Sequence, residues 1–288
     1  MATNKDIDKT NISRTKNHKT IINTAENLVV YLTFELFEKA GVKHAFSTKK
    51  GGVSTGIYKS MNLSFHRGDE YENVLENHKL FAEAVGYDYK KTVFSDQIHE
   101  TQIARVSEKD MGKGMKGEKG ITGMDGLVTD IPGIPLMTFY ADCVPLLFYD
   151  PVKKVIGAAH AGWRGTVAGM AKCMVKYLAE NMGCNVSDVL VVIGPSICMD
   201  CYEVDGDVAK KFYDAFEEKD HNKILLPKND DKYQLNLWEA NKIYLEEAGI
   251  LKENIQMPDI CTCHNPDLMI SHRYTNGKRG NMAAVIVL

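Results

Sequence analysis

The 288-residue chain lacks any long apolar run, and no segment approaches the roughly eighteen uninterrupted apolar residues that a membrane span requires. Its first twenty residues, MATNKDIDKTNISRTKNHKT, lack the apolar stretch of a secretory signal. An excess of one charge is also missing: 35 basic residues stand against 38 acidic ones, so nothing favours nucleic acid or a membrane surface as a partner. We therefore expect a cytoplasmic protein that binds neither.

The seven cysteines do not have the even number and close spacing of a disulfide framework, which predicts reduced thiols. No internal repeat, linker or low-complexity segment divides the chain after its polar start. We therefore predict a disordered tail over residues 1–22 and a single domain over residues 23–288, long enough to bury a substantial core.

Apolar periodicity predicts alternating strands and helices, and hence an α/β fold in which helices flank mixed β-sheets. Strands are expected near residues 29–34 and 43–47, in VLVVIGPSIC, and at the C-terminus. Helices are expected over residues 69–85, 204–216 and 237–248. A further helix is predicted over 166–182, with Thr166 as its N-cap and Gly183 as its C-cap.

The segment PLMTFYADCVPLLFYDPVKKVIGAAHAGWRG places a cysteine and a histidine in two apolar runs that bracket a turn, DPVK. If Tyr149 faces Lys154 across a four-residue loop, the hairpin register pairs Cys143 with His160. Facing residues of an antiparallel pair have Cβ atoms about 4.5–5.5 Å apart. One metal ion could then take both a thiolate and an imidazole.

A buried cysteine can equally be an inert core residue, and backbone carbonyls can satisfy a buried histidine. The neighbouring residues favour a site, because AGWRG leads into a predicted helix whose N-terminus, with Arg164, could hold an anion. A catalytic zinc usually has three protein ligands and one open position. The third ligand is expected to be His99 in DQIHE, with His66 in SFHRGD as the alternative.

Six motifs in this order closely resemble the YfiH/YlmD family of laccase-domain proteins, whose members include purine nucleoside phosphorylases: HAFSTKKGGVSTGIYKSMNLSFHRGD, DQIHE, MDGLVTDIPGIPLMTFYADCVPLLFYDP, AAHAGWRGT, IGPSICMDCYEV and CTCHNPDLMISHRY. The resemblance runs from about residue 28 to the C-terminus. It implies a layered α/β sandwich and a Zn²⁺ ion held by His99, Cys143 and His160. It also implies phosphorolysis of adenosine, inosine or guanosine, together with adenosine deamination and methylthioadenosine cleavage.

Within this resemblance, Lys49, Ser54 and Arg164 are the expected phosphate ligands, and Asp142 is expected to orient a metal ligand or its loop. The sequence also departs from the family pattern. Lys49 stands where an arginine is usual, Asn281 follows Gly280 in place of an arginine, and Tyr274 replaces the second arginine of a pair. An ammonium group cannot make the bidentate contact of a guanidinium, so substrate preference could differ. The oligomeric state, monomer or homodimer, is left open.

Three other functions remain to be weighed. A copper polyphenol oxidase is disfavoured, because coupled copper sites need many histidines in His-x-His pairs and this chain has nine histidines and no such pair. A hydrolase that edits peptidoglycan precursors is the second alternative. The third is a non-enzymatic module stabilised by zinc, which Cys198, Cys201, Cys261, Cys263 and His264 could bind.

Overall fold

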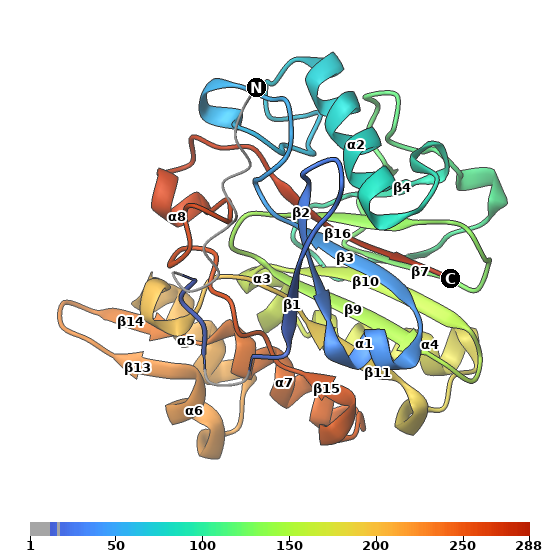
Figure 1. Cartoon of the computed structure of the whole chain (residues 1–288). Helices are drawn as coiled ribbons and strands as arrows, with labels where there is room; N and C mark the ends of the chain where they lie inside the picture. The colour runs from blue at the N-terminus through green and yellow to red at the C-terminus, as the bar shows by residue number, and fades with distance from the viewer. Residues whose placement is uncertain (1–11, 16–17) are drawn as a thin grey trace.

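The computed structural model describes residues 12–15 and 18–288. Two β-sheets lie face to face, and helices cover the outer face of each (Figure 1). The described residues include no helix that is both long and apolar enough to cross a membrane. This layered α/β arrangement with mixed sheets confirms the predicted fold class.

The first sheet has seven strands, in the order β1 (Thr20–Thr24), β2 (Val30–Phe34), β3 (Lys43–Ser47), β16 (Met282–Val287), β8 (Leu136–Tyr140), β4 (Val93–Asp96) and β6 (Ile121–Thr122). Helix α2 (Tyr71–Val85) packs on its outer face, where Phe81 joins Val285 in one core cluster. The neighbouring Ile286 faces the second sheet. The C-terminal strand is therefore buried on both sides, which explains its uninterrupted apolar sequence.

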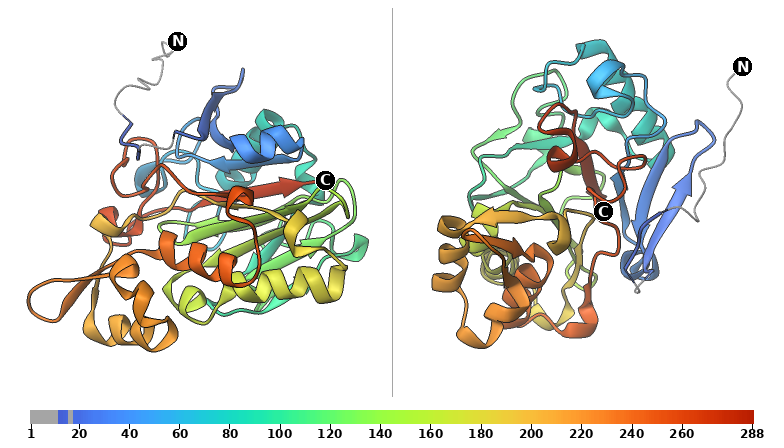
Figure 2. Two further views of the ribbon diagram at one scale, coloured as in Figure 1. Left: turned by 90° about the horizontal axis from the view of Figure 1, so that it is seen from below. Right: turned by 90° about the vertical axis from the view of Figure 1, so that its left-hand side faces the viewer.

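The second sheet has six strands, in the order β15 (Ile255–Gln256), β11 (Leu190–Ile193), β9 (Val144–Asp150), β10 (Val155–Ala161), β7 (Gly126–Thr129) and β5 (Ile103–Arg105). Its outer face is covered by α3 (Trp163–Val167), α4 (Met170–Met182) and α7 (Leu237–Glu247), as Figure 2 shows from below. Along β9, Phe148 faces these helices and Leu147 faces the other sheet. The core thus consists of three apolar layers separated by the two sheets.

A small third sheet, ordered β12 (Glu203–Asp205), β14 (Lys232–Leu235) and β13 (Leu225–Pro227), carries α5 (Gly206–Ala215) and α6 (Glu218–Ile224). Its β13–β14 hairpin projects from the body (Figure 2, left, orange). Two further short helices are α1 (Glu35–Ala40) and α8 (His272–Thr275). The prediction of a loop over KNDDKYQL was wrong, because β14 lies in this segment. The segment is mostly polar, and its apolar residues are too few to show the alternation of a strand.

The described part of the predicted tail is attached to the body. Strand β1 begins at Thr20 and pairs with β2, and the backbone at Arg14 bridges to Ile260. The boundary expected at residue 22 therefore falls inside a strand, because Ile22 supplies a buried apolar side chain that the polar composition around it concealed. Residues 1–11 and 16–17 of that predicted tail lie outside the described residues.

The predicted helix over residues 166–182 is two helices. Gly169 takes a left-handed backbone conformation (φ 82°) between α3 and α4, so Thr166 lies inside α3 and does not cap a helix. Its hydroxyl instead accepts a hydrogen bond from Asn241 of α7. The C-cap at Gly183 (φ 67°) agrees with the prediction, since glycine adopts this conformation at little cost.

Candidate metal centre

The hairpin of β9 and β10 has a register two residues away from the predicted one, with His160 facing Pro145 in place of Cys143. The turn explains the difference. The carboxylate of Asp150 accepts hydrogen bonds from the N–H groups of residues 152 and 153, and the loop comprises residues 151–154. Because a shift of two residues preserves the face to which each side chain points, Cys143 stays on the same side as His160.

Cys143, His160 and His99 come together as the sequence analysis expected, with ligand atoms within 4.8 Å of one another. His99 lies in the loop between β4 and β5 with φ 66°, and its ring meets that of His160 edge to face at 4.8 Å. A Cβ atom on Gly162 would lie 3.1 Å from the sulfur of Cys143 and 3.1 Å from Cδ2 of His99. The three side chains therefore enclose a position that only glycine fits without displacing them.

Asp125, which was not among the site residues expected from the sequence, supports two of the three side chains. It is fully buried at the start of β7, and its carboxylate accepts the backbone N–H groups of residues 98, 99 and 100. It also lies 2.8 Å from Nδ1 of His160. One carboxylate thus holds the His99 loop and orients the His160 ring. Its only sequence signal was an acidic residue directly before a buried apolar strand.

The electrostatics of the group favour the metal-binding form of the cysteine. Burial alone would raise the pKa of the Cys143 thiol, but the charges and hydrogen bonds of His160 and His99 lower it to about 6. Burial opposes protonation of His160, yet Cys143 and Asp125 raise its pKa to about 9. Since a metal binds the thiolate and a neutral imidazole, the cysteine is held close to the state that coordination needs, and His160 would release a proton when the ion binds.

The donor set fits a transition metal. One thiolate and two imidazoles suit zinc or copper and do not suit calcium or magnesium, which prefer oxygen ligands. Three protein ligands leave a fourth position of a tetrahedron free for water or substrate. The hydrogen bond between Asp125 and His160 is the outer contact that commonly fixes the tautomer of a ligating histidine.

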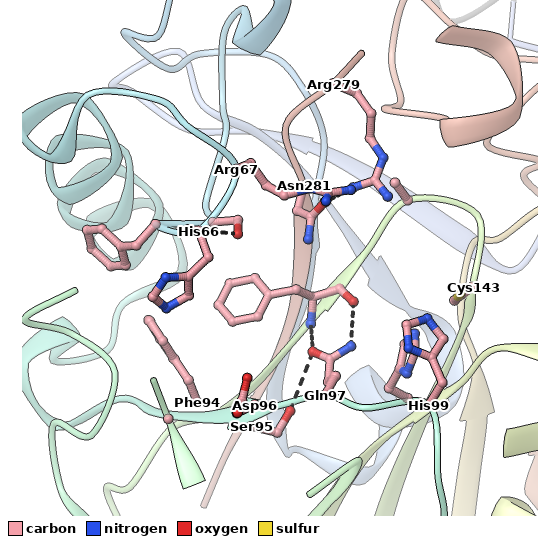
Figure 3. A pocket seen from close by; sticks show the side chains of 16 residues that line it. His66, Arg67, Phe94, Ser95, Asp96, Gln97, His99, Cys143, Arg279 and Asn281 are labelled. Carbon is pink, nitrogen blue, oxygen red and sulfur yellow. Dashed lines mark hydrogen bonds between the residues drawn. The ribbon is translucent and has the colours of Figure 1, made fainter. Parts of the chain in front are cut away.

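Two cavities border this cluster. The smaller, of about 260 Å³, is lined by residues that include His66, Phe94, Gln97 and Asn281 (Figure 3). The larger, of about 440 Å³, is lined by residues that include Trp163, Arg164, Tyr202, Leu237, His272 and Arg273. Both share Arg67, His99, Cys143 and Arg279. A ligand in either cavity would therefore reach the cluster.

Four arginines surround the cluster, and none of them forms an ion pair within the described residues. The guanidinium of Arg164 lies 4.3 Å from the Trp163 ring centre, and that of Arg273 lies 5.3 Å from the Tyr202 ring centre. Nε of Arg279 is buried without a hydrogen-bond partner. Burial, followed by the charge of Arg67, lowers the pKa of Arg279 to about 10. The unneutralised positive charge makes this a favourable place for an anion.

The other expected phosphate ligands lie elsewhere. Lys49 lines a third cavity of about 450 Å³, which adjoins the other two at Arg279, and its ammonium group donates to the carbonyl of Pro266. Ser54 is buried, donates to Asp69 at 2.6 Å and accepts from Asn77 at 2.8 Å. Neither residue lines the two cavities that border the cluster, whereas Arg164 does.

Asp142 and His66 also have clear positions. Asp142 has a left-handed backbone (φ 86°), and its carboxylate accepts hydrogen bonds from Thr262, Ser271 and the backbone N–H of Arg273. It therefore ties the segment that carries Cys143 to the C-terminal loops. His66 lines the smaller cavity but does not belong to the group of converging ligand atoms, so His99 is the third ligand that the geometry favours.

Comparison with known proteins identifies the family of the chain. Residues 43–288 match the family described as multi-copper polyphenol oxidoreductase laccase. Purine nucleoside phosphorylase YlmD of Bacillus subtilis is 39% identical over 244 residues, which is 84% of this chain and 86% of that protein. The structure of Bacillus licheniformis YfiH superposes with a TM-score of 0.86 at 37% identity, covering 90% of this chain and 96% of that one. Geobacillus stearothermophilus YlmD gives a TM-score of 0.85 at 31% identity, covering 96% and 98%. The chain therefore belongs to the YfiH/YlmD family of laccase-domain proteins.

Proposed function

We propose that this protein is a zinc-dependent purine nucleoside phosphorylase, which converts a purine nucleoside and phosphate to the free base and ribose 1-phosphate. The observation that carries the proposal is the Cys-His-His cluster beside a cavity lined by arginines without ion-pair partners among the described residues. The names of its relatives from Bacillus subtilis and Geobacillus stearothermophilus support the same activity.

Zinc is the metal that we assign to His99, Cys143 and His160, since it commonly binds such a set and keeps one position open. When bound, it would supply positive charge that polarises and partly neutralises a substrate oxygen. The chain does not offer the ligands of a multicopper oxidase: the described residues form two groups of converging histidines and cysteines, each the size of a single-ion site. We therefore do not assign copper oxidase chemistry.

The phosphate is assigned to the arginines that line both cavities, Arg67 and Arg279, together with Arg164. This assignment replaces Lys49 and Ser54, which lie outside these cavities. A phosphate oxygen would attack the anomeric carbon while the bond between that carbon and the purine nitrogen breaks. The departing base would take a proton. Trp163 and Tyr202 offer apolar ring surface for the base in the larger cavity.

The test is to incubate the purified protein with adenosine or inosine, with and without phosphate, and to identify every product. We expect base and ribose 1-phosphate only when phosphate is present. Inosine formed from adenosine without phosphate would reveal the additional deaminase activity, and methylthioadenosine tests the related phosphorolysis. Inactivity on all purine nucleosides, with turnover of a peptidoglycan precursor, would overturn the proposal in favour of cell-wall editing.

A further inference from the structure

A second cluster of ligand atoms lies outside the cavities of the proposed active site. Cys198 directly precedes the short helix η6 (Met199–Cys201) that follows β11, and Cys201 is its last residue. Cys261 and His264 lie in the loop between β15 and α8. Their four ligand atoms lie within 4.8 Å of one another. Nothing in the phosphorolysis chemistry uses these side chains, so their convergence needs an explanation of its own.

Hydrogen bonds that require no metal ion hold the two segments together. Ser196 and Cys261 form a parallel bridge, and the N–H of Thr262 donates to the Ser196 carbonyl at 3.1 Å. The N–H of Cys198 points to the sulfur of Cys261 at 3.3 Å. Asn265 donates to the carbonyl of Cys261 at 2.8 Å. The ligands are thus presented by a preformed scaffold, which lowers the entropy cost of binding an ion.

The distance between the Cys198 sulfur and the His264 ring nitrogen matches one tetrahedral ion. With zinc–sulfur bonds of about 2.3 Å and a zinc–nitrogen bond of about 2.0 Å, the ligand atoms of a tetrahedron lie roughly 3.5–3.8 Å apart. The sulfur of Cys198 is 3.5 Å from Nδ1 of His264. A disulfide would account for two of the cysteines, but it would give no reason for a third sulfur and an imidazole nitrogen to face the same point.

We propose that Cys198, Cys201, Cys261 and His264 bind one zinc ion in a closed, structural site. Three thiolates and one imidazole form a common structural zinc shell, and the two-residue gap between Cys198 and Cys201 has the usual spacing. Cys198 and Cys261 are buried while His264 is exposed, so the ion enters from the His264 side. All four positions of the tetrahedron are filled by protein, which leaves none for substrate.

The ion connects two loops that form part of the active-site wall. Tyr202, directly after Cys201, lines the arginine-rich cavity. Thr262, directly after Cys261, donates to the carboxylate of Asp142 at 2.6 Å, and Asp142 precedes the cluster ligand Cys143. Closing the second site therefore fixes both the cavity wall and the segment that carries Cys143.

Metal content measured on purified, zinc-reconstituted protein tests this inference independently of nucleoside turnover. We expect two zinc ions per chain in the wild type and in the control Cys173→Ser, a partly exposed cysteine of α4. Cys143→Ser and the double variant Cys198→Ser/Cys261→Ser are each expected to bind one. The double variant should also melt at a lower temperature than Cys173→Ser.

One zinc ion in the wild type and none in Cys143→Ser would overturn the inference. So would a disulfide, found by intact mass, between any two of the three cysteines in protein purified with a reductant. If the double variant does not fold, the zinc content of Cys143→Ser is sufficient. One retained zinc ion supports the second site, and the absence of zinc contradicts it. A protein that binds two zinc ions but is inactive on nucleosides would contradict the proposed function and still support this inference.

Discussion

The carboxylate of Asp125 lies 2.8 Å from Nδ1 of His160, and this hydrogen bond directs the other ring nitrogen toward Cys143. The same carboxylate accepts the N–H of His99 at 3.1 Å. His99 has a left-handed backbone (φ 66°), which a residue with a Cβ adopts only when its surroundings hold it there. A single buried acid therefore positions two imidazoles that come from different segments of the chain.

Asp125→Asn should weaken metal binding at the cluster by roughly 10–100-fold, because an amide cannot accept every hydrogen bond that the carboxylate accepts. Zinc affinity measured in competition with a chromophoric chelator checks this expectation. Asp130→Asn is the control, since Asp130 is an exposed residue after β7 that pairs with Arg105. Equal zinc affinity in both variants would mean that Asp125 only supports the fold.

Gly162→Ala should displace the ligands with little effect on the backbone. The new methyl group would lie 3.1 Å from the sulfur of Cys143, while φ of −68° at this residue is ordinary for alanine. We expect loss of cluster zinc with a melting temperature near that of the wild type. Gly165→Ala in the same helix is the matched control, because its nearest new contact would be 3.4 Å away. Full zinc occupancy in Gly162→Ala would show that the cluster tolerates a side chain at its centre.

Arg164→Ala should raise the KM for phosphate by roughly tenfold or more, since hydrogen bonds to charged groups contribute about 1.5–3 kcal/mol. Lys49→Ala should change that KM by less than about twofold, because Lys49 lines neither of the two cavities that border the cluster and its ammonium group contacts the Pro266 carbonyl. Steady-state kinetics with inosine in excess provide both values. A larger effect from Lys49→Ala would return the phosphate to Lys49, as the family resemblance implied.

His78 should make the protein less stable in mild acid. Burial between Phe65 and Phe94 lowers the pKa of this imidazole to about 4, below the ordinary histidine value of 6.5 that applies to the unfolded chain. Between these two values the unfolded chain binds a proton that the folded chain does not. The free energy of unfolding should therefore fall as the pH drops from about 6.5 to about 4, by on the order of 3 kcal/mol in total.

Urea unfolding near pH 7 and near pH 5 measures the effect of His78. The variant His78→Gln keeps a donor for the Leu63 carbonyl, which His78 contacts at 2.8 Å, and has no group that titrates in this range. We expect a smaller loss of stability on acidification in His78→Gln than in the wild type. Equal losses would assign the acid sensitivity to other groups, such as His44, whose pKa is also lowered by burial.

The sequence allowed the hairpin ligands to be predicted because strand periodicity decides which face a side chain occupies. Cys143 and His160 stay on one face even though the register was off by two residues, since a shift of two preserves the face. The position of the four-residue loop was the error: it comprises residues 151–154 and not 150–153, and hydrogen bonds to the Asp150 carboxylate that the turn sequence did not specify hold it there.

Other parts of the site could not be predicted from local patterns. Arg67, Arg279 and Asp125 reach the cluster from loops far apart in the sequence, so no spacing rule connects them. Choosing His99 over His66 needed the family resemblance. Lys49 was expected to bind phosphate only because of the family resemblance, at a position where the family usually has an arginine. In the structure its ammonium group contacts the carbonyl of Pro266.

Phosphate-dependent turnover of inosine by the wild type, Cys143→Ala and Cys173→Ala is the decisive comparison. With phosphate, the wild type and Cys173→Ala should release hypoxanthine and ribose 1-phosphate in equal amounts, and without phosphate they should release neither. Cys143→Ala should lose at least about 100-fold in rate while keeping the wild-type circular dichroism spectrum. Wild-type rates in Cys143→Ala, or release of hypoxanthine that does not depend on phosphate, would contradict a phosphorylase built on this cluster.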